Sequence, residues 1–190
     1  MESGKTIYVA LLRGINVGGK NKIKMAELRT ALENIGLSRV KTYIQSGNVL
    51  FESQEDEATV RQQIEREIAS IFGITLTVVM RTAEQMEHIV SHCPFSAELI
   101  ADAAASCVGE SLYVALLPES PPSSGIEKLA AANNGNDEYH ISGRDVYLLF
   151  RHSVRDAKLS TNLQKLGVQV TVRNWNTMNK LVEMAKEMRQ

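Results

Sequence analysis

The sequence has too few of several residue types to fit some common protein classes. Its two cysteines, Cys93 and Cys107, form no C-x-x-C pair, which excludes a disulfide framework and that class of redox motif. Its apolar runs have the length of strands and fall far below the roughly 20 residues that span a bilayer. The segment Met1–Lys5 lacks the apolar stretch of a secretion signal. We therefore expect a cytoplasmic protein without membrane contact.

Neither sign of charge dominates the chain. Its formal net charge is −1, which gives no global attraction to nucleic acid or anionic lipid, so any such partner needs a local patch. Hydrophobic residues at 44% with 23% charged residues are typical of a globular protein with an ordinary core. The composition gives no indication of disorder.

An internal repeat divides the chain of 190 residues into two copies. Ile7–Leu12 returns almost unchanged as Leu112–Leu117, and Tyr43–Gly47 is echoed by Tyr139–Gly143. Features that both copies share are explained by the fold, whereas features of one copy alone are candidates for function. The predicted organisation is a first domain at residues 1–93, a linker at 94–110 and a second domain at 111–190.

Hydrophobic periodicity predicts the same order of elements, βαββαβ and a trailing helix, in both copies. This order is typical of the ferredoxin-like unit, an α+β fold with helices on one face of a four-stranded antiparallel sheet. Gly36 and Gly73 are placed to end the two helices of the first copy. Following the chain direction, the loop after the first strand and the turn between the second and third strands lie at the same end of the sheet.

The loop Arg13–Lys24 is the clearest feature of the first copy alone. It contains four cations and no acid, whereas the second copy has the proline-rich, acidic segment Pro118–Gly125 at the equivalent place. Glycines allow close backbone approach, and the free N–H groups at the following helix N-terminus favour anions. The loop is therefore a candidate anion cradle, and the alternative is a tight loop with solvated lysines.

Within this loop, Gly14–Asn21 matches the phosphate-binding pattern G-x-x-x-x-G-K-[ST] at every fixed position except the last. Asn21 stands where Ser or Thr would hold Mg²⁺, and an antiparallel sheet is not the setting of such hydrolases. The pattern therefore favours binding over hydrolysis, and whether the protein is an enzyme stays open. We expect no metal and no cofactor.

A second asymmetric motif, Arg173–Thr177, begins the last helix of the second copy. Arg173 matches Arg81 of the first copy, so a shared structural partner explains the arginine. Asn174 is a candidate N-cap. Trp175, the single tryptophan, is interpreted as a residue that packs between domains or as a stacking platform for a ring.

Three stretches resemble the bacterial family of unknown function numbered 1697. They are Tyr8–Gly19, Thr42–Val49 and Arg173–Thr177, and the likeness extends over essentially the whole chain. The resemblance implies ferredoxin-like α+β units. It carries over no activity, cofactor or partner.

The leading hypothesis is that the first copy binds a small phosphate-bearing or nucleotide-like ligand. One alternative is RNA or single-stranded DNA binding on the sheet face, for which Tyr8, Phe51, Tyr113 and Phe150 are the available aromatics. Another is an interaction scaffold without small-molecule chemistry, and the oligomeric state is left open. The candidate ligand-binding residues are Arg13, Asn16, Gly18, Gly19, Lys20, Asn21, Ser46, Asn48, Arg173, Asn174, Trp175 and Asn176.

Overall fold

The computed structural model describes residues 4–190, which form two compact units. Residues 1–3 lie outside the described part of the chain, and with them the beginning of the segment Met1–Lys5, which has no apolar stretch of a secretion signal. The first unit contains the described residues up to His88 together with Lys180–Gln190, and the second contains Ile89–Asn179. Both boundaries fall inside helices, so each unit is described by itself.

The first unit is built on a four-stranded antiparallel sheet with the strand order β2-β3-β1-β4. Side chains point to alternate faces along the apolar strand β1, and Tyr8, Ala10 and Leu12 face the core under the helices. The strands are β1 (Thr6–Leu12), β2 (Ser38–Tyr43), β3 (Asn48–Ser53) and β4 (Val78–Thr82).

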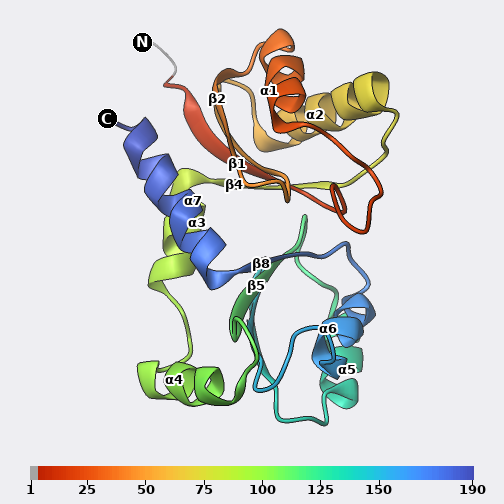
Figure 1. The fold of residues 1–190 in the computed structure, drawn as a ribbon, viewed down its shortest axis with the longest axis vertical. Coiled ribbons are helices and arrows are strands. Elements are labelled where there is room, and N and C mark those ends of the chain that lie inside the picture. Colours follow the sequence, from red (N-terminus) through yellow and green to blue (C-terminus); the bar gives the residue numbers. More distant parts are fainter. Residues whose placement is uncertain (1–3) are drawn as a thin grey trace. The chain divides into compact units, whose positions relative to one another are not determined.

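Two helices, α1 (Met25–Asn34) and α2 (Glu57–Phe72), cover one face of this sheet (Figure 1). The predicted glycine caps are confirmed. Gly36 has φ of 93°, and the amide of Leu37 donates to the carbonyl of Leu32 at 3.3 Å, which closes α1 in a Schellman motif. Gly73 ends α2 in the left-handed region, and Asp56 caps its start by accepting the amide of Thr59 at 2.9 Å.

The C-terminal end of α7 (Trp175–Met188) also belongs to the first unit. Arg189, just beyond this helix, pairs at 2.7 Å with Glu84 of α3 (Ala83–Ser91). Arg39 on β2 donates to the backbone carbonyl of Met188. These contacts hold the end of the chain against the elements of the first unit.

The second unit repeats the sheet, with the strand order β6-β7-β5-β8 and every neighbouring pair antiparallel. Its core lies between this sheet and the helices α5 and α6 with the 3₁₀ turn η1. The elements are β5 (Leu112–Leu116), α5 (Ser123–Ala132), β6 (Glu138–Ser142), β7 (Asp145–Leu149), α6 (Lys158–Asn162), η1 (Leu163–Leu166) and β8 (Thr171–Asn174).

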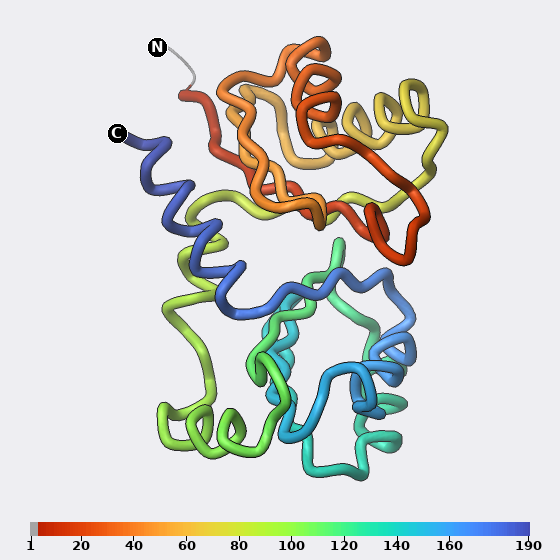
Figure 2. The backbone as a smooth tube through the Cα atoms, viewed as in Figure 1, coloured from red at the N-terminus to blue at the C-terminus, as the bar shows by residue number. Residues whose placement is uncertain are grey.

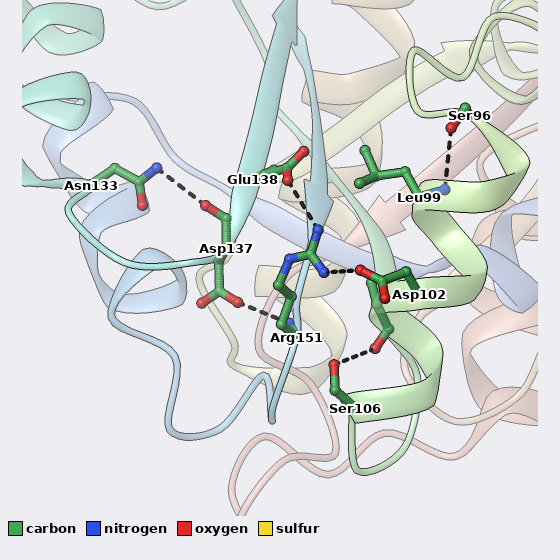
Figure 3. Close-up of polar contacts among 9 residues, drawn as sticks. Ser96, Leu99, Asp102, Ser106, Asn133, Asp137, Glu138 and Arg151 are labelled. Atoms are coloured by element: carbon green, nitrogen blue, oxygen red, sulfur yellow. Dashed lines mark hydrogen bonds and ion pairs between the residues drawn. The ribbon is translucent and has the colours of Figure 1, made fainter.

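The predicted linker contains a helix, α4 (Ala97–Ser106), that packs within the second unit. Ser96 caps it by accepting the amide of Leu99 at 3.2 Å. Figure 3 shows that Arg151 joins Asp102 of α4 to Glu138 of β6, and the Arg151–Glu138 pair measures 3.2 Å. The ion pairs raise the pKa of Arg151, with the contact to Asp102 contributing most.

The α+β class and the two antiparallel sheets of four strands confirm the broad prediction, while the finer ferredoxin-like assignment stays an interpretation. Two local predictions differ. The sequence pattern predicts the β2–β3 turn at Gln45–Asn48, whereas the structure has it one residue earlier, at Ile44–Gly47, because Asn48 of β3 already pairs with Tyr43. The sequence pattern also predicts one helix near residues 157–166, whereas the structure has the short helix α6 followed by η1, which ends at Gly167 in the left-handed region. Among residues 4–190, no helix is long and apolar enough to cross a membrane.

Candidate functional site

The glycine-rich loop joins β1 to α1 and folds into a small hairpin of its own (Figure 2). The amide of Lys20 donates to the carbonyl of Val17 at 3.1 Å, and the amide of Asn16 donates to the carbonyl of Asn21 at 3.1 Å. Gly18 and Gly19 both have positive φ, 58° and 75°, as a type I′ turn requires. This hairpin differs from a phosphate-wrapping loop, because the amides of Asn16 and Lys20 bond to carbonyls of the loop itself.

Asn16 fixes the base of this hairpin. Its side-chain amide donates to the carbonyl of Ile23 at 3.0 Å and to the carbonyl of Gln45 at 2.8 Å, and its Oδ1 accepts the amide of Ile23 at 2.9 Å. The contact with Gln45 confirms that the loop and the β2–β3 turn meet at the same end of the sheet. Both side-chain N–H groups of Asn16 are used in this way, so its role is to shape the site.

Asn21 supports the hairpin in a similar way. Its side-chain amide donates to the carbonyl of Gly14 at 3.0 Å. Asn16 and Asn21 have φ of 53° and 49°, a left-handed conformation that asparagine tolerates better than most residues. The two asparagines therefore explain how the loop holds its shape.

The β2–β3 turn uses Ser46 and Asn48 for its own closure. Asn48 is completely buried, and its side-chain amide donates to the carbonyl of Tyr43 at 3.0 Å and to Oγ of Ser46 at 2.9 Å. The amide of Leu12 donates to the carbonyl of Gly47 at 2.8 Å, which ties the end of β1 to this turn. The ligand role expected for Ser46 and Asn48 stays a prediction, and the contacts seen are structural.

Between the loop, α1 and the β2–β3 turn lies a cavity of about 580 Å³. Two cations, Lys22 and Lys24, stand at its wall together with the carboxylate of Glu27. Of the candidate ligand residues, Asn16 and Gly19 line the cavity, whereas Arg13 and Lys20 do not. The complete lining is Asn16, Gly19, Lys22, Ile23, Lys24, Glu27 and Gln45.

Lys24 is also the N-cap of α1. Its backbone is extended, with φ of −75° and ψ of 133°, and its side chain accepts no hydrogen bond from the first helical turn. An uncapped first turn offers backbone N–H groups to an anion. Lys24 pairs with Glu27 at 3.5 Å, but both side chains are exposed, and such a pair contributes little stability. An anionic ligand can therefore compete with Glu27 for Lys24.

Sequence reasoning singled out Lys20 and passed over Lys22, Lys24 and Gln45. The type I′ turn sets the direction of the chain after Lys20, and this direction decides which lysines border the cavity. One signal was available in the sequence, because Lys22 and Lys24 lie within three residues of Met25, the first apolar residue of the helix. Cations at that place border the helix N-terminus.

The motif at the start of α7 is held by contacts inside the second unit. Asn174 caps the helix, as predicted, by accepting the amide of Thr177 at 2.8 Å. Trp175 packs against the cluster of Ala103, Leu112 and Leu149, and the Asn176 side chain donates to Glu110. The ligand role of these residues stays a prediction.

Arg81 and Arg173 have equivalent structural partners in the two copies, as the repeat predicted. Each is buried, and each Nη1 donates to the carbonyl of the preceding residue, Met80 at 2.7 Å and Val172 at 3.0 Å. Burial lowers the pKa of Arg173 to about 10, because the charged form loses its hydration. The two arginines are therefore features of the repeated fold.

The aromatic side chains that RNA binding would need lie in the two cores. Tyr8 and Phe51 belong to the core of the first unit, with ring centroids 5.8 Å apart. Tyr113 and Phe150 pack edge to face in the second, at 5.5 Å. Rings that fill a core beneath helices do not offer a stacking surface to bases. Within residues 4–190, no group of three or more His, Cys, Asp or Glu side chains is arranged to hold a metal ion.

Comparison with known proteins identifies relatives without assigning a function. The family model described as "Protein of unknown function (DUF1697)" matches residues 6–147. The chain is similar to the solved structure of the conserved bacterial protein SP0830 from Streptococcus pneumoniae. The TM-score is 0.72 at 26% identity, over 96% of this chain and 99% of that one. No curated protein matches.

Proposed function

Since the chain belongs to the DUF1697 family of proteins of unknown function, we propose from its geometry that the first unit binds a small phosphate-bearing molecule. The observation that carries the proposal is the cavity of about 580 Å³ in which Lys22, Lys24 and the uncapped start of α1 converge. The volume lies in the range of small-molecule sites. A nucleotide or a sugar phosphate is the class of ligand that fits this volume and charge.

In this proposal the residues around the cavity have separate roles. The ammonium groups of Lys22 and Lys24 supply the positive charge, and the first-turn amides of α1 donate hydrogen bonds to phosphate oxygens. Gly19 has no side chain to fill the space, so the ligand can approach the backbone of the loop. Asn16 takes no direct part and instead holds the loop against Gln45.

The test begins with a thermal-shift screen of nucleotides, sugar phosphates and inorganic phosphate, followed by calorimetric titration of any hit. A ligand that binds only the folded chain stabilises it by about 2.7 kcal/mol at 100 times its dissociation constant, enough to shift the melting temperature clearly. Because the contacts are charged and exposed, we expect the affinity to fall as salt rises. No stabilisation by any compound of the panel would end the proposal.

The loop offers a matched control for the cavity lysines. A Lys22→Ala, Lys24→Ala double variant should lose binding, because both cations stand at the cavity wall. Lys20→Ala should retain it, because Lys20 is an exposed lysine of the same loop outside the cavity lining. Equal loss in both variants would show that the ligand responds to the charge of the whole loop, contrary to the proposed site.

A further inference from the structure

The two sheets differ in how their corresponding edge strands are protected. On β2 a bulge interrupts the register between Ser38 and Lys41, and Arg39 adopts φ of 52° and pairs with Glu52 at 2.7 Å. Bulges and charged side chains of this kind prevent an edge from pairing with another chain. The β2 edge is therefore unsuited to strand addition.

The β6 edge has no bulge, and its one charged side chain, Glu138, lies at the start of the strand and pairs with Arg151. Glu138–Ser142 pairs with β7 in unbroken register, without a bulge, a lysine or a proline. Along the strand, His140 and Ser142 are exposed, while Tyr139 and Ile141 are half-buried against the core of the second unit. The outer edge of β6 is therefore a regular strand backbone, and the apolar side chains on one face of this strand lie at the margin of the core.

The turn after β6 determines which backbone groups point outward. Ser142 and Asp145 flank the two-residue turn Gly143–Arg144, so they form a hydrogen-bonded pair. Because hydrogen-bonding direction alternates along a strand, His140 also bonds toward β7. The N–H and C=O groups of Tyr139 and Ile141 then point away from the sheet, at the edge.

We propose that β6 pairs antiparallel with β6 of a second copy of this chain, about a two-fold axis through His140. In this register Tyr139 stands opposite the partner's Ile141, and Ile141 stands opposite the partner's Tyr139. Each pair exchanges two backbone hydrogen bonds, so the four outward groups of each strand are all satisfied. Two four-stranded sheets become one continuous sheet across the dimer.

The side chains of β6 suit a second copy of the same strand. A two-fold interface must be self-complementary. The half-buried Tyr139 and Ile141 meet as aromatic and β-branched partners, a favourable cross-strand pair. Glu138 lies opposite the partner's Ser142, and its carboxylate is already paired with Arg151 at 3.2 Å. This register therefore brings no like-charged side chains directly opposite each other.

The experiment uses His140, which is exposed and lies opposite its own copy in the proposed dimer. Sedimentation of the full chain over a concentration series should show reversible growth toward twice the 21.0-kDa mass of the chain. His140→Asp and His140→Lys each place like charges directly opposite each other, which should raise the dissociation constant about five-fold. An equimolar mixture of the two variants should recover wild-type association, because the charges are then opposite.

Two further measurements separate this edge from any other surface. His152→Asp makes the same change at an exposed histidine outside β6 and should associate like the wild type. The amides of Tyr139 and Ile141 should become protected from hydrogen exchange as concentration rises, whereas the amide of His140 is already protected. A wild-type chain that stays monomeric at all concentrations overturns the proposal. So does association that neither His140 variant weakens.

Discussion

Gly47 and Gly143 occupy equivalent turns in the two units, yet their surroundings predict different costs of substitution by alanine. Both have positive φ, 82° and 59°. A Cβ at Gly47 would lie 2.8 Å from Cβ of Leu12 and 2.8 Å from Cδ1 of Ile15, whereas a Cβ at Gly143 would meet no atom within 4 Å. Gly47→Ala and Gly143→Ala therefore share backbone strain but differ in overpacking.

The difference between the two variants can be worked out from these contacts. The left-handed backbone costs an alanine about 1–2 kcal/mol at either turn. The loss of unfolded-state freedom on replacing glycine is also common to both variants and cancels in the comparison. Only Gly47→Ala adds an overpacking cost of about 1–3 kcal/mol, and Cβ of Leu12 cannot move away because it is attached to the backbone of β1. We expect Gly47→Ala to be the more destabilising by about 2 kcal/mol, the middle of that overpacking range.

The assay is urea denaturation followed by far-ultraviolet circular dichroism, with both variants compared to the wild type under one buffer condition. The midpoint should fall further for Gly47→Ala, with an unchanged slope. An Ile15→Val background should return part of the loss in Gly47→Ala, because the shorter side chain removes the Cδ1 contact. The stability effects of independent substitutions usually add to within about 0.5 kcal/mol, which sets the limit for a meaningful difference. If the losses of stability in the two glycine variants differ by less than this limit, the overpacking argument fails.

Two other substitutions test the second unit. Gly125→Ala would place a Cβ 2.2 Å from the backbone oxygen of Leu166, so we expect α5 to separate from η1, with a loss of core amide protection measured by hydrogen exchange. Tyr147 donates its hydroxyl to the carbonyl of Ile89 at 2.7 Å, so Tyr147→Phe leaves that acceptor unsatisfied at a cost of about 1–3 kcal/mol, measured by urea denaturation. Burial raises the pKa of Tyr147 to about 12, so between pH 10 and about 12 the unfolded chain loses a proton that the folded chain keeps. Wild-type stability should therefore fall as pH rises through this window, and Tyr147→Phe should show a shallower fall.

The elements of the fold were predictable because their signals are local or repeated. Gly36 and Gly73 end helices as expected, since a left-handed residue at that place is a short-range requirement. The second unit has the same order of elements as the first, because the same apolar pattern appears twice in the sequence. The exact position of the β2–β3 turn was not predictable, because it depends on the buried Asn48 pairing with Tyr43 and donating its side-chain amide to the carbonyl of Tyr43.

The candidate site was predicted only as a region. Chain direction predicted that the glycine-rich loop and the β2–β3 turn lie at the same end of the sheet, and the Asn16–Gln45 contact confirms that they meet there. The individual residues did not follow, because the direction of each lysine depends on a hairpin turn and on contacts between segments far apart in sequence. Asn16, expected to orient a ligand, instead bonds to Ile23 and Gln45 with its entire carboxamide.

Trp175 is the single indole of the chain, and it packs in a cluster that belongs to the second unit. Selective excitation of this ring therefore yields an emission signal from that unit alone, without any label. Emission from a half-buried indole shifts to longer wavelength when the cluster with Leu112 and Leu149 opens. Ellipticity, in contrast, averages over both units. If the emission and ellipticity curves coincide during denaturant unfolding, the two units unfold as one cooperative body, and if the curves separate, the units unfold in succession.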